Sequence, residues 1–339
     1  MEPFRSSDFL PWGMFDRITD IRINDPDRPL RAARARMRRS KLTADGRLSL
    51  LAADHPARGV TAVGKNPIAM SDRHDYLARI LRVLVSEAVD GVMATMDILE
   101  ELLVIDDLLR EAGGPSLLDG KLLIASLNRG GLASSIWEMD DPVSGPTPAT
   151  CAAWALDGAK MLLRLCDREP GSLNTLRECS RAVSECNALG LPMFLEPLPV
   201  TKAEDSYKVV KTKEALARIA GVASALGDSS RYLWLKLPYC DGYESVARAT
   251  TLPILLLGGE SAGDATLFFR EVVSGLAAGG NVRGALAGRN VLYSGAEDPL
   301  PVAESLGGVV HKNWSLEQAL EFRARFQSRD MGLLAKYLH

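Results

Sequence analysis

The chain lacks the patterns that mark several classes of protein. Its five cysteines have no CxxC spacing, so neither a disulfide framework nor a zinc site is indicated. Only four histidines are present, which disfavours a metal centre built on three of them. No segment contains the roughly 18 apolar residues of a membrane span, and the charged start is not a signal peptide. We expect a cytoplasmic protein with no membrane contact and no bound metal or cofactor.

Strong charge of one sign is also missing. The 339 residues carry a net charge of -3, which gives no reason to expect binding to nucleic acid. A composition of 47% hydrophobic and 24% charged residues is ordinary for a globular protein. No GxGxxG motif follows the first apolar run, as a doubly wound dinucleotide-binding sheet would require.

The chain does contain a repeated alternation of short apolar runs and segments with helical periodicity. The apolar runs predict eight strands at residues 48–53, 91–95, 122–127, 159–165, 193–195, 232–235, 254–257 and 285–287. Helices are predicted between several of them, at residues 75–89, 99–112, 173–189, 213–225 and 265–278. Eight such units over about 250 residues predict a parallel (β/α)8 TIM barrel.

Two regions flank or interrupt this alternation. We assign residues 1–45 to an N-terminal helical extension and residues 46–339 to the barrel. Arginines in residues 31–39 recur at helical intervals and predict a solvated or salt-bridged helix that caps the bottom of the barrel. Residues 140–150 contain three prolines and predict a loop over the barrel mouth.

Lys236 is the most informative single residue. Four apolar or aromatic residues precede it and Pro238 follows closely, which predicts a short buried strand ending at a turn. A lysine there either reaches solvent at the strand end or supplies an amine for Schiff-base chemistry. Lys160 opens a second apolar strand. If both lysines point into the barrel, desolvation and mutual repulsion lower their pKa values and make a nucleophile available near neutral pH.

Other polar residues follow the predicted strands, where barrel enzymes carry their active sites. They are Asp54, Asp97, Asn128, Arg129 and Glu196. The last two strands end in Gly258 and Gly259 and in Gly288 and Arg289. Loops at these two positions commonly bind phosphate through backbone N–H groups, and an arginine adds a bidentate contact.

Several sequence strings resemble class I aldolases of the deoxyribose-phosphate aldolase superfamily. FLEP (194–197), WLK (234–236), AKMLL (159–163) and GALAGR (284–289) are similar to strands of tagatose-bisphosphate and sulfofructose-phosphate aldolases. AADHPARG (52–59), NRGGL (128–132) and LLLGG (255–259) resemble an actinobacterial branch associated with inositol catabolism. The resemblance covers residues from about 30 to 295. Residues 128–131 depart from the tagatose-bisphosphate aldolase pattern, so the substrate is less well defined than the chemistry.

The resemblance implies specific roles. Lys236 falls on the Schiff-base lysine, Lys160 on the lysine that assists it, and Glu196 on the acid/base carboxylate, which we expect to have a raised pKa. Asp54 falls on an aspartate that orients Lys160 or moves a proton, although a helix N-cap is an equally good interpretation. Gly259 and Arg289 fall on the phosphate site.

Together these features predict a metal-independent class I aldolase that cleaves a sugar phosphate. The resemblance favours 2-deoxy-5-keto-gluconate 6-phosphate, cleaved to dihydroxyacetone phosphate and malonate semialdehyde. Asp97, Asn128 and Arg129 are then expected to bind its hydroxyl or carboxylate end. Alternatives are tagatose-bisphosphate, sulfofructose-phosphate or deoxyribose-phosphate cleavage, a zinc-dependent aldolase, and a regulatory barrel that only binds sugar phosphate. We also expect a homo-oligomer.

Overall fold

Eight parallel strands close into a barrel in the computed structural model, which describes residues 4–204, 206–259 and 263–338. The barrel strands are β1 (Leu48–Ala53), β2 (Gly91–Ala94), β3 (Leu122–Ser126), β4 (Gly158–Leu165), β5 (Met193–Ala203), β7 (Leu233–Pro238), β8 (Ile254–Leu257) and β9 (Val282–Ala287). They pair in the order β4-β3-β2-β1-β9-β8-β7-β5, and β4 also pairs with β5 to close the circle. The predicted TIM barrel is therefore confirmed.

One strand extends well beyond its predicted end. β5 was predicted to stop at residue 195, before a segment that contains Pro197 and Pro199. In the structure β7 pairs with β5 only as far as Leu195. Residues 196–199 of β5 still pair with β4, and residues 200–203 form an antiparallel hairpin with β6 (Ser206–Val209). Prolines are tolerated there because one side of the strand needs no ladder donor.

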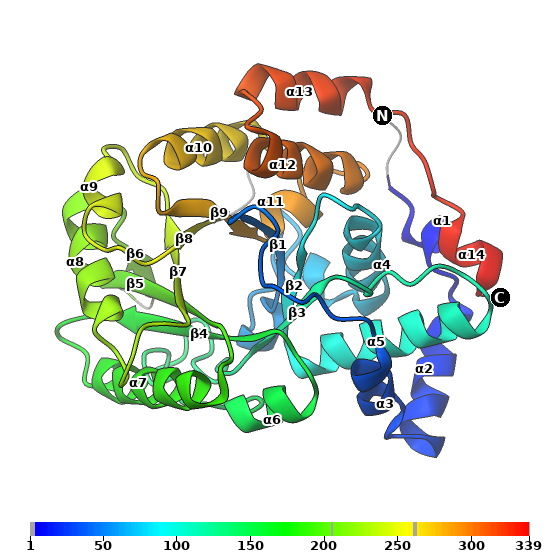
Figure 1. Ribbon diagram of the computed structural model, residues 1–339, viewed down its shortest axis with the longest axis horizontal. Coiled ribbons are helices and arrows are strands. Elements are labelled where there is room, and N and C mark those ends of the chain that lie inside the picture. Colours follow the sequence, from blue (N-terminus) through cyan, green and yellow to red (C-terminus); the bar gives the residue numbers. More distant parts are fainter. Residues whose placement is uncertain (1–3, 205, 260–262, 339) are drawn as a thin grey trace.

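Helices cover the outside of the barrel (Figure 1). Those within and after the barrel are α4 (Arg73–Leu84), α5 (Met96–Glu111), α6 (Pro148–Ala153), α7 (Gly171–Leu189), α8 (Lys213–Ser224), α9 (Glu244–Ala247), α10 (Thr266–Ala277), α11 (Arg289–Leu292), α12 (Leu300–Lys312), α13 (Leu316–Arg325) and α14 (Leu333–Tyr337). The five predicted helices correspond to α4, α5, α7, α8 and α10. None of the described helices is both long and apolar enough to cross a membrane.

Strand alternation divides the apolar side chains between two cores. Leu48, Leu50 and Ala52 of β1 point into the barrel, where they pack with residues such as Phe194 and Leu286. The intervening side chains of the strands face the helices and join the larger outer core. Successive side chains of a strand point to opposite faces, so each inward polar residue near a strand end projects into the barrel mouth.

The N-terminal segment forms α1 (Ser6–Phe9), α2 (Gly13–Asn24) and α3 (Arg28–Ala35) before β1. Arg31 and Arg34 of the predicted arginine-rich helix lie on α3, but the arginines that pair with the bottom of the barrel follow this helix. Arg36 and Arg38 pair with Asp157, which precedes β4, and Arg39 pairs with Asp90, which precedes β2. The helix ends at Ala35 because the backbone at Arg36 is extended.

Candidate active site

A lysine–glutamate–lysine cluster lies inside the barrel. Phe194 and Trp234 pack in the barrel interior, and Glu196 and Lys236 follow them by two positions on the same face of β5 and β7. Lys160 pairs with Phe194 across β4 and β5 and also points inward. Glu196 Oε2 lies 2.8 Å from Lys160 Nζ and 3.1 Å from Lys236 Nζ. A single carboxylate therefore bridges the two lysines.

Lys236 and Glu196 lie within their strands, whereas the sequence predicted that they follow them. β7 continues to Pro238 because its residues pair with β8 as far as Leu257, and proline occupies the last position of the strand. This register places Lys236 deeper than a strand end. Its side chain is only 6% exposed, which disagrees with an amine that simply reaches solvent.

Asp54, directly after β1, extends the cluster. Its Oδ2 lies 3.2 Å from Lys160 Nζ and accepts a hydrogen bond from Ser126 Oγ at 2.9 Å. The guanidinium of Arg129 contacts the same oxygen. Ser126 was not among the predicted site residues. It follows the interior residue Ile124 of β3 by two positions, so strand alternation could have identified it as an inward-facing polar residue.

The cluster holds more cationic groups than anionic ones. Burial lowers the pKa values of both Lys160 and Lys236, and the neighbouring Arg129 adds to both effects. Two carboxylates, Asp54 and Glu196, face Lys160, Lys236 and Arg129. The cluster therefore becomes electrically neutral when one lysine loses its proton.

The expected raised pKa of Glu196 is wrong. Burial alone would raise it, but Lys160, Lys236 and Arg129 outweigh burial and lower the pKa of Glu196 far below its usual range. Glu196 is thus an ionised carboxylate in the unliganded site. It is ready to accept a proton and becomes an acid only after it has taken one.

The predicted phosphate loops lie after β8 and β9. The Asn290 side-chain amide donates a hydrogen bond to the Gly258 carbonyl oxygen and joins the two loops. Gly259 has a left-handed backbone with φ +65°, which favours glycine. The half-buried Arg289 begins α11, and its charge contributes to the lowered pKa of Lys236. The structure therefore places Arg289 within electrostatic range of the lysine cluster.

His55, to which the sequence assigned no role, also lies at this side of the mouth. A Cβ atom at Gly288 would lie only 2.5 Å from His55 Cε1, so the close packing of the imidazole requires glycine at this position. Burial and the charges of Arg289 and Lys236 lower the pKa of His55 to about 3. The imidazole is therefore neutral at physiological pH.

Two predicted binding residues have other partners in the structure. Asn128 is fully buried: its Nδ2 donates to the carbonyl oxygens of Asp141 and Leu162, and its Oδ1 accepts from the Leu162 N–H. This position fits a role in fixing the loop after β3 and does not fit substrate contact. Asp97 lies in the first turn of α5 and pairs with Arg73 at 2.6 Å.

A cavity of about 640 Å³ opens beside the cluster, over the ends of β2 and β3. Ser126 and Arg129 line it, together with residues of the segments after β1, β2 and β3 and of α5 and α6. The predicted mouth loop contributes Ser144, Gly145 and Pro146, although α6 begins at Pro148 within the predicted range. This volume lies within the range of roughly 300–1,000 Å³ that is typical of small-molecule sites.

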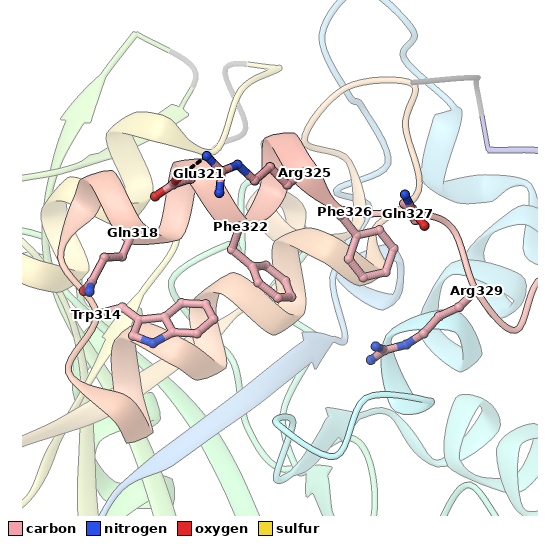
Figure 2. A pocket seen from close by; sticks show the side chains of 8 residues that line it. All are labelled: Trp314, Gln318, Glu321, Phe322, Arg325, Phe326, Gln327 and Arg329. Carbon is pink, nitrogen blue, oxygen red and sulfur yellow. Dashed lines mark ion pairs between the residues drawn. The ribbon is translucent and has the colours of Figure 1, made fainter.

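A second hollow, of about 630 Å³, lies on the outside of the barrel at α13 (Figure 2). Trp314, Phe322 and Phe326 line it in a row, and Arg325 pairs with Glu321 at its edge. None of its lining residues lies at the end of a barrel strand. We therefore place the candidate active site at the barrel mouth.

Comparison with known proteins identifies the family. The Cgl0159-like family profile matches residues 46–305. The chain belongs to the Cgl0159-like family. Cgl0159 of Corynebacterium glutamicum has a solved structure that is 32% identical to this chain, with a TM-score of 0.83, and the match covers 92% of this chain and 100% of that chain.

More distant relatives share part of the sequence or only the fold. An uncharacterised aldolase of Saccharolobus solfataricus is 31% identical over 140 residues, which are 40% of this chain and 48% of that protein. The match therefore spans about half the length of this relative. An archaeal fructose 1,6-bisphosphate aldolase shares the fold, with 19% identity, a TM-score of 0.56 and coverage of 79% of this chain and 95% of that chain. Among the described residues, no group of three His, Cys, Asp or Glu is placed to hold a metal ion.

Proposed function

We propose that the protein is a class I aldolase that cleaves a phosphorylated keto sugar or keto sugar acid through a Schiff base on Lys236. The observation that carries this proposal is the buried Lys160–Glu196–Lys236 cluster at the mouth of a TIM barrel. Burying two ammonium groups against one carboxylate costs free energy, because one positive charge is left without a partner. This cost is avoided when one lysine is an uncharged amine, which is the form that Schiff-base chemistry needs. The names of the relatives, which include an aldolase, support the same class of reaction.

Geometry separates the roles of the two lysines. Lys160 is fully buried and contacts the carboxylates of both Asp54 and Glu196. Burial lowers its pKa, but these two carboxylates oppose that effect and favour its ammonium form. Among the described carboxylates, Lys236 contacts only that of Glu196, and its side chain retains slight exposure. We therefore assign the nucleophile to Lys236 and the proton-donating ammonium to Lys160.

The reaction then follows from these positions. The neutral Lys236 amine attacks the substrate ketone, Lys160 protonates the carbinolamine oxygen, and loss of water leaves an iminium ion. Glu196 accepts the proton of the hydroxyl on the β-carbon, two carbons from the iminium carbon, while the bond between the α- and β-carbons breaks. The bond electrons move into the iminium to form an enamine, and the hydroxyl carbon leaves as an aldehyde. Protonation and hydrolysis of the enamine release the ketone product and restore Lys236.

The loops after β8 and β9 are the proposed binding site for the phosphate end of the substrate. Gly258, Gly259, Gly288 and Arg289 are proposed to bind the phosphate next to the ketone, since Arg289 is close enough to influence the pKa of Lys236. On this assignment the sequence resemblance favours 2-deoxy-5-keto-gluconate 6-phosphate. Tagatose bisphosphate, sulfofructose phosphate and deoxyribose phosphate are the alternatives.

Borohydride trapping tests the proposal. Reduction in the presence of dihydroxyacetone phosphate should add the mass of the reduced adduct to the peptide that contains Lys236. The variant Lys236→Ala should lose both the adduct and cleavage activity, whereas the control Lys208→Ala, an exposed lysine on β6, should keep both. EDTA should leave cleavage intact. An adduct on Lys160 would reverse the two roles, and the absence of any adduct would refute Schiff-base catalysis.

A further inference from the structure

The position of the cavity over β2 and β3 indicates which part of the substrate binds there. β3 lies four strands away from β8 in either direction around the barrel, since the order is β3-β2-β1-β9-β8 one way and β3-β4-β5-β7-β8 the other. The cavity is therefore across the mouth from the loop after β8, and the lysine cluster lies between them. If phosphate binds at the β8 and β9 loops, the cavity receives the half of the substrate that becomes the aldehyde.

The charged side chains that line this cavity already have partners. Arg129 contacts Asp54, and Asp97 pairs with Arg73 at 2.6 Å. Glu100 of α5 pairs with Arg22 of α2 at 2.9 Å. A carboxylate or phosphate on the aldehyde half would have to take Arg129 from Asp54, and it would lie close to the Asp54 charge. The charges of the cavity therefore favour an uncharged aldehyde.

The pair formed by Arg129 and Asp54 also has unused hydrogen-bonding capacity. Within the described part of the chain, Arg129 Nε and Asp54 Oδ1 are buried and have no hydrogen-bond partner. Both atoms belong to one ion pair, which adjoins the cavity through Arg129. A hydroxyl group that reaches this pair can accept from the Arg129 donor and donate to the Asp54 acceptor. A carboxylate can only accept, so it would leave Asp54 Oδ1 without a partner. Leaving such groups unpaired in a buried site is costly.

We propose that this cavity binds the aldehyde-derived half of the substrate as an uncharged, hydroxylated chain, with the Arg129–Asp54 pair recognising the hydroxyl next to the aldehyde carbon. This inference rests on the proposed Schiff-base aldolase chemistry. It argues against 2-deoxy-5-keto-gluconate 6-phosphate and the three alternatives as substrates, because the aldehyde half of each carries a charge. A volume of about 640 Å³ far exceeds the space that a three-carbon aldehyde occupies. The cavity therefore suits chains of four or more carbons, whose apolar surface contacts residues such as Leu132 and Trp154.

The test uses condensation of dihydroxyacetone phosphate with a set of aldehydes. D-Erythrose and D-glyceraldehyde carry the recognised hydroxyl, 3-hydroxypropanal lacks it, and malonate semialdehyde lacks it and carries a carboxylate. We expect kcat/KM for glyceraldehyde to exceed that for 3-hydroxypropanal by at least about tenfold, because the second aldehyde leaves buried polar groups unpaired. We expect erythrose to be used at least as well as glyceraldehyde, and malonate semialdehyde to be the poorest acceptor.

Two variants on the loop after β3 test whether the aldehyde-derived half of the substrate binds in this cavity. Leu132 lines the cavity and is 38% exposed, so Leu132→Trp fills the space without disturbing the core. Ile136, on the same loop, is 99% exposed and does not line the cavity, which makes Ile136→Trp the matched control. Leu132→Trp should lower kcat/KM for erythrose at least about tenfold and change that for glycolaldehyde less than about twofold. The reason is that the longer aldehyde needs the space that tryptophan fills, whereas the two-carbon aldehyde does not reach it. Ile136→Trp should change neither.

The outcomes separate the inference from the proposed function. Equal losses for both aldehydes in Leu132→Trp, no loss at all, or a preference of the unmodified protein for malonate semialdehyde would each overturn the inference. In these cases borohydride would still trap dihydroxyacetone phosphate on Lys236, and the aldolase function would stand. Failure to trap any adduct would overturn both.

Discussion

Replacing Glu196 with glutamine should move the pH at which Lys236 becomes reactive. Glu196 Oε2 lies 3.1 Å from Lys236 Nζ, a separation at which the Coulomb energy is about 5 kcal/mol for an effective dielectric constant of about 20. Relaxation and solvent reduce such effects, and an opposite charge this close typically shifts a pKa by roughly one to three pH units. The carboxylate raises the pKa of Lys236, so its removal lowers that pKa. The neutral amine then forms at lower pH.

The assay is borohydride trapping of dihydroxyacetone phosphate followed by mass spectrometry across a range of pH. In Glu196→Gln the acid limb of the trapping profile should move down by roughly one to three pH units. Cleavage should fall about 10²- to 10⁴-fold, because the variant lacks the proton acceptor. The control Glu169→Gln removes a carboxylate that pairs with Lys202 on the surface and should change neither result. An acid limb that stays in place or moves to higher pH would refute the electrostatic reasoning.

Two further predictions concern the phosphate end and the barrel bottom. Arg289→Ala should weaken apparent substrate binding by about 1.5–3 kcal/mol, the value of a charge-assisted contact, and an unchanged KM would remove Arg289 from the phosphate site. His311 bonds to Asp45 and Asp90 at 2.9 and 3.0 Å; burial lowers its pKa, but these contacts outweigh burial and raise it above the ordinary value. The stabilisation is complete below about pH 6.5 and is lost as pH rises through the raised pKa. The difference in Tm between the unmodified protein and His311→Ala should therefore be larger at pH 6 than at pH 9, and thermal melts that show the opposite trend would contradict this.

The sequence alone predicts the barrel because its signals are local. Apolar runs of strand length alternate with helical periodicity, and both properties depend only on residues close together in the chain. A lysine within an apolar run, such as Lys160 or Lys236, is detectable in the same way. The glycine loops after β8 and β9 are also visible, since turns require these residues.

Contacts between distant segments determined the rest. The β5–β6 hairpin was missed because prolines signal the end of a strand unless its partners are known. Asn128 looks like a binding residue by position, and only tertiary packing gives its amide three backbone hydrogen bonds, two with Leu162 and one with Asp141. The pKa of Glu196 also depends on contacts between distant segments. It was expected to be raised, but two lysines and an arginine from three other strands and loops lower it.

The sequence by itself thus determined which chemical groups are present and on which kind of element they lie. Tertiary structure decided which of them meet. Lys160, Glu196 and Lys236 are separated by 36 and 40 positions along the chain, yet barrel closure brings their side chains within 3.1 Å of a common oxygen. The reason is physical: electrostatic coupling and hydrogen bonding depend on distances in space, which the local pattern of a sequence does not specify.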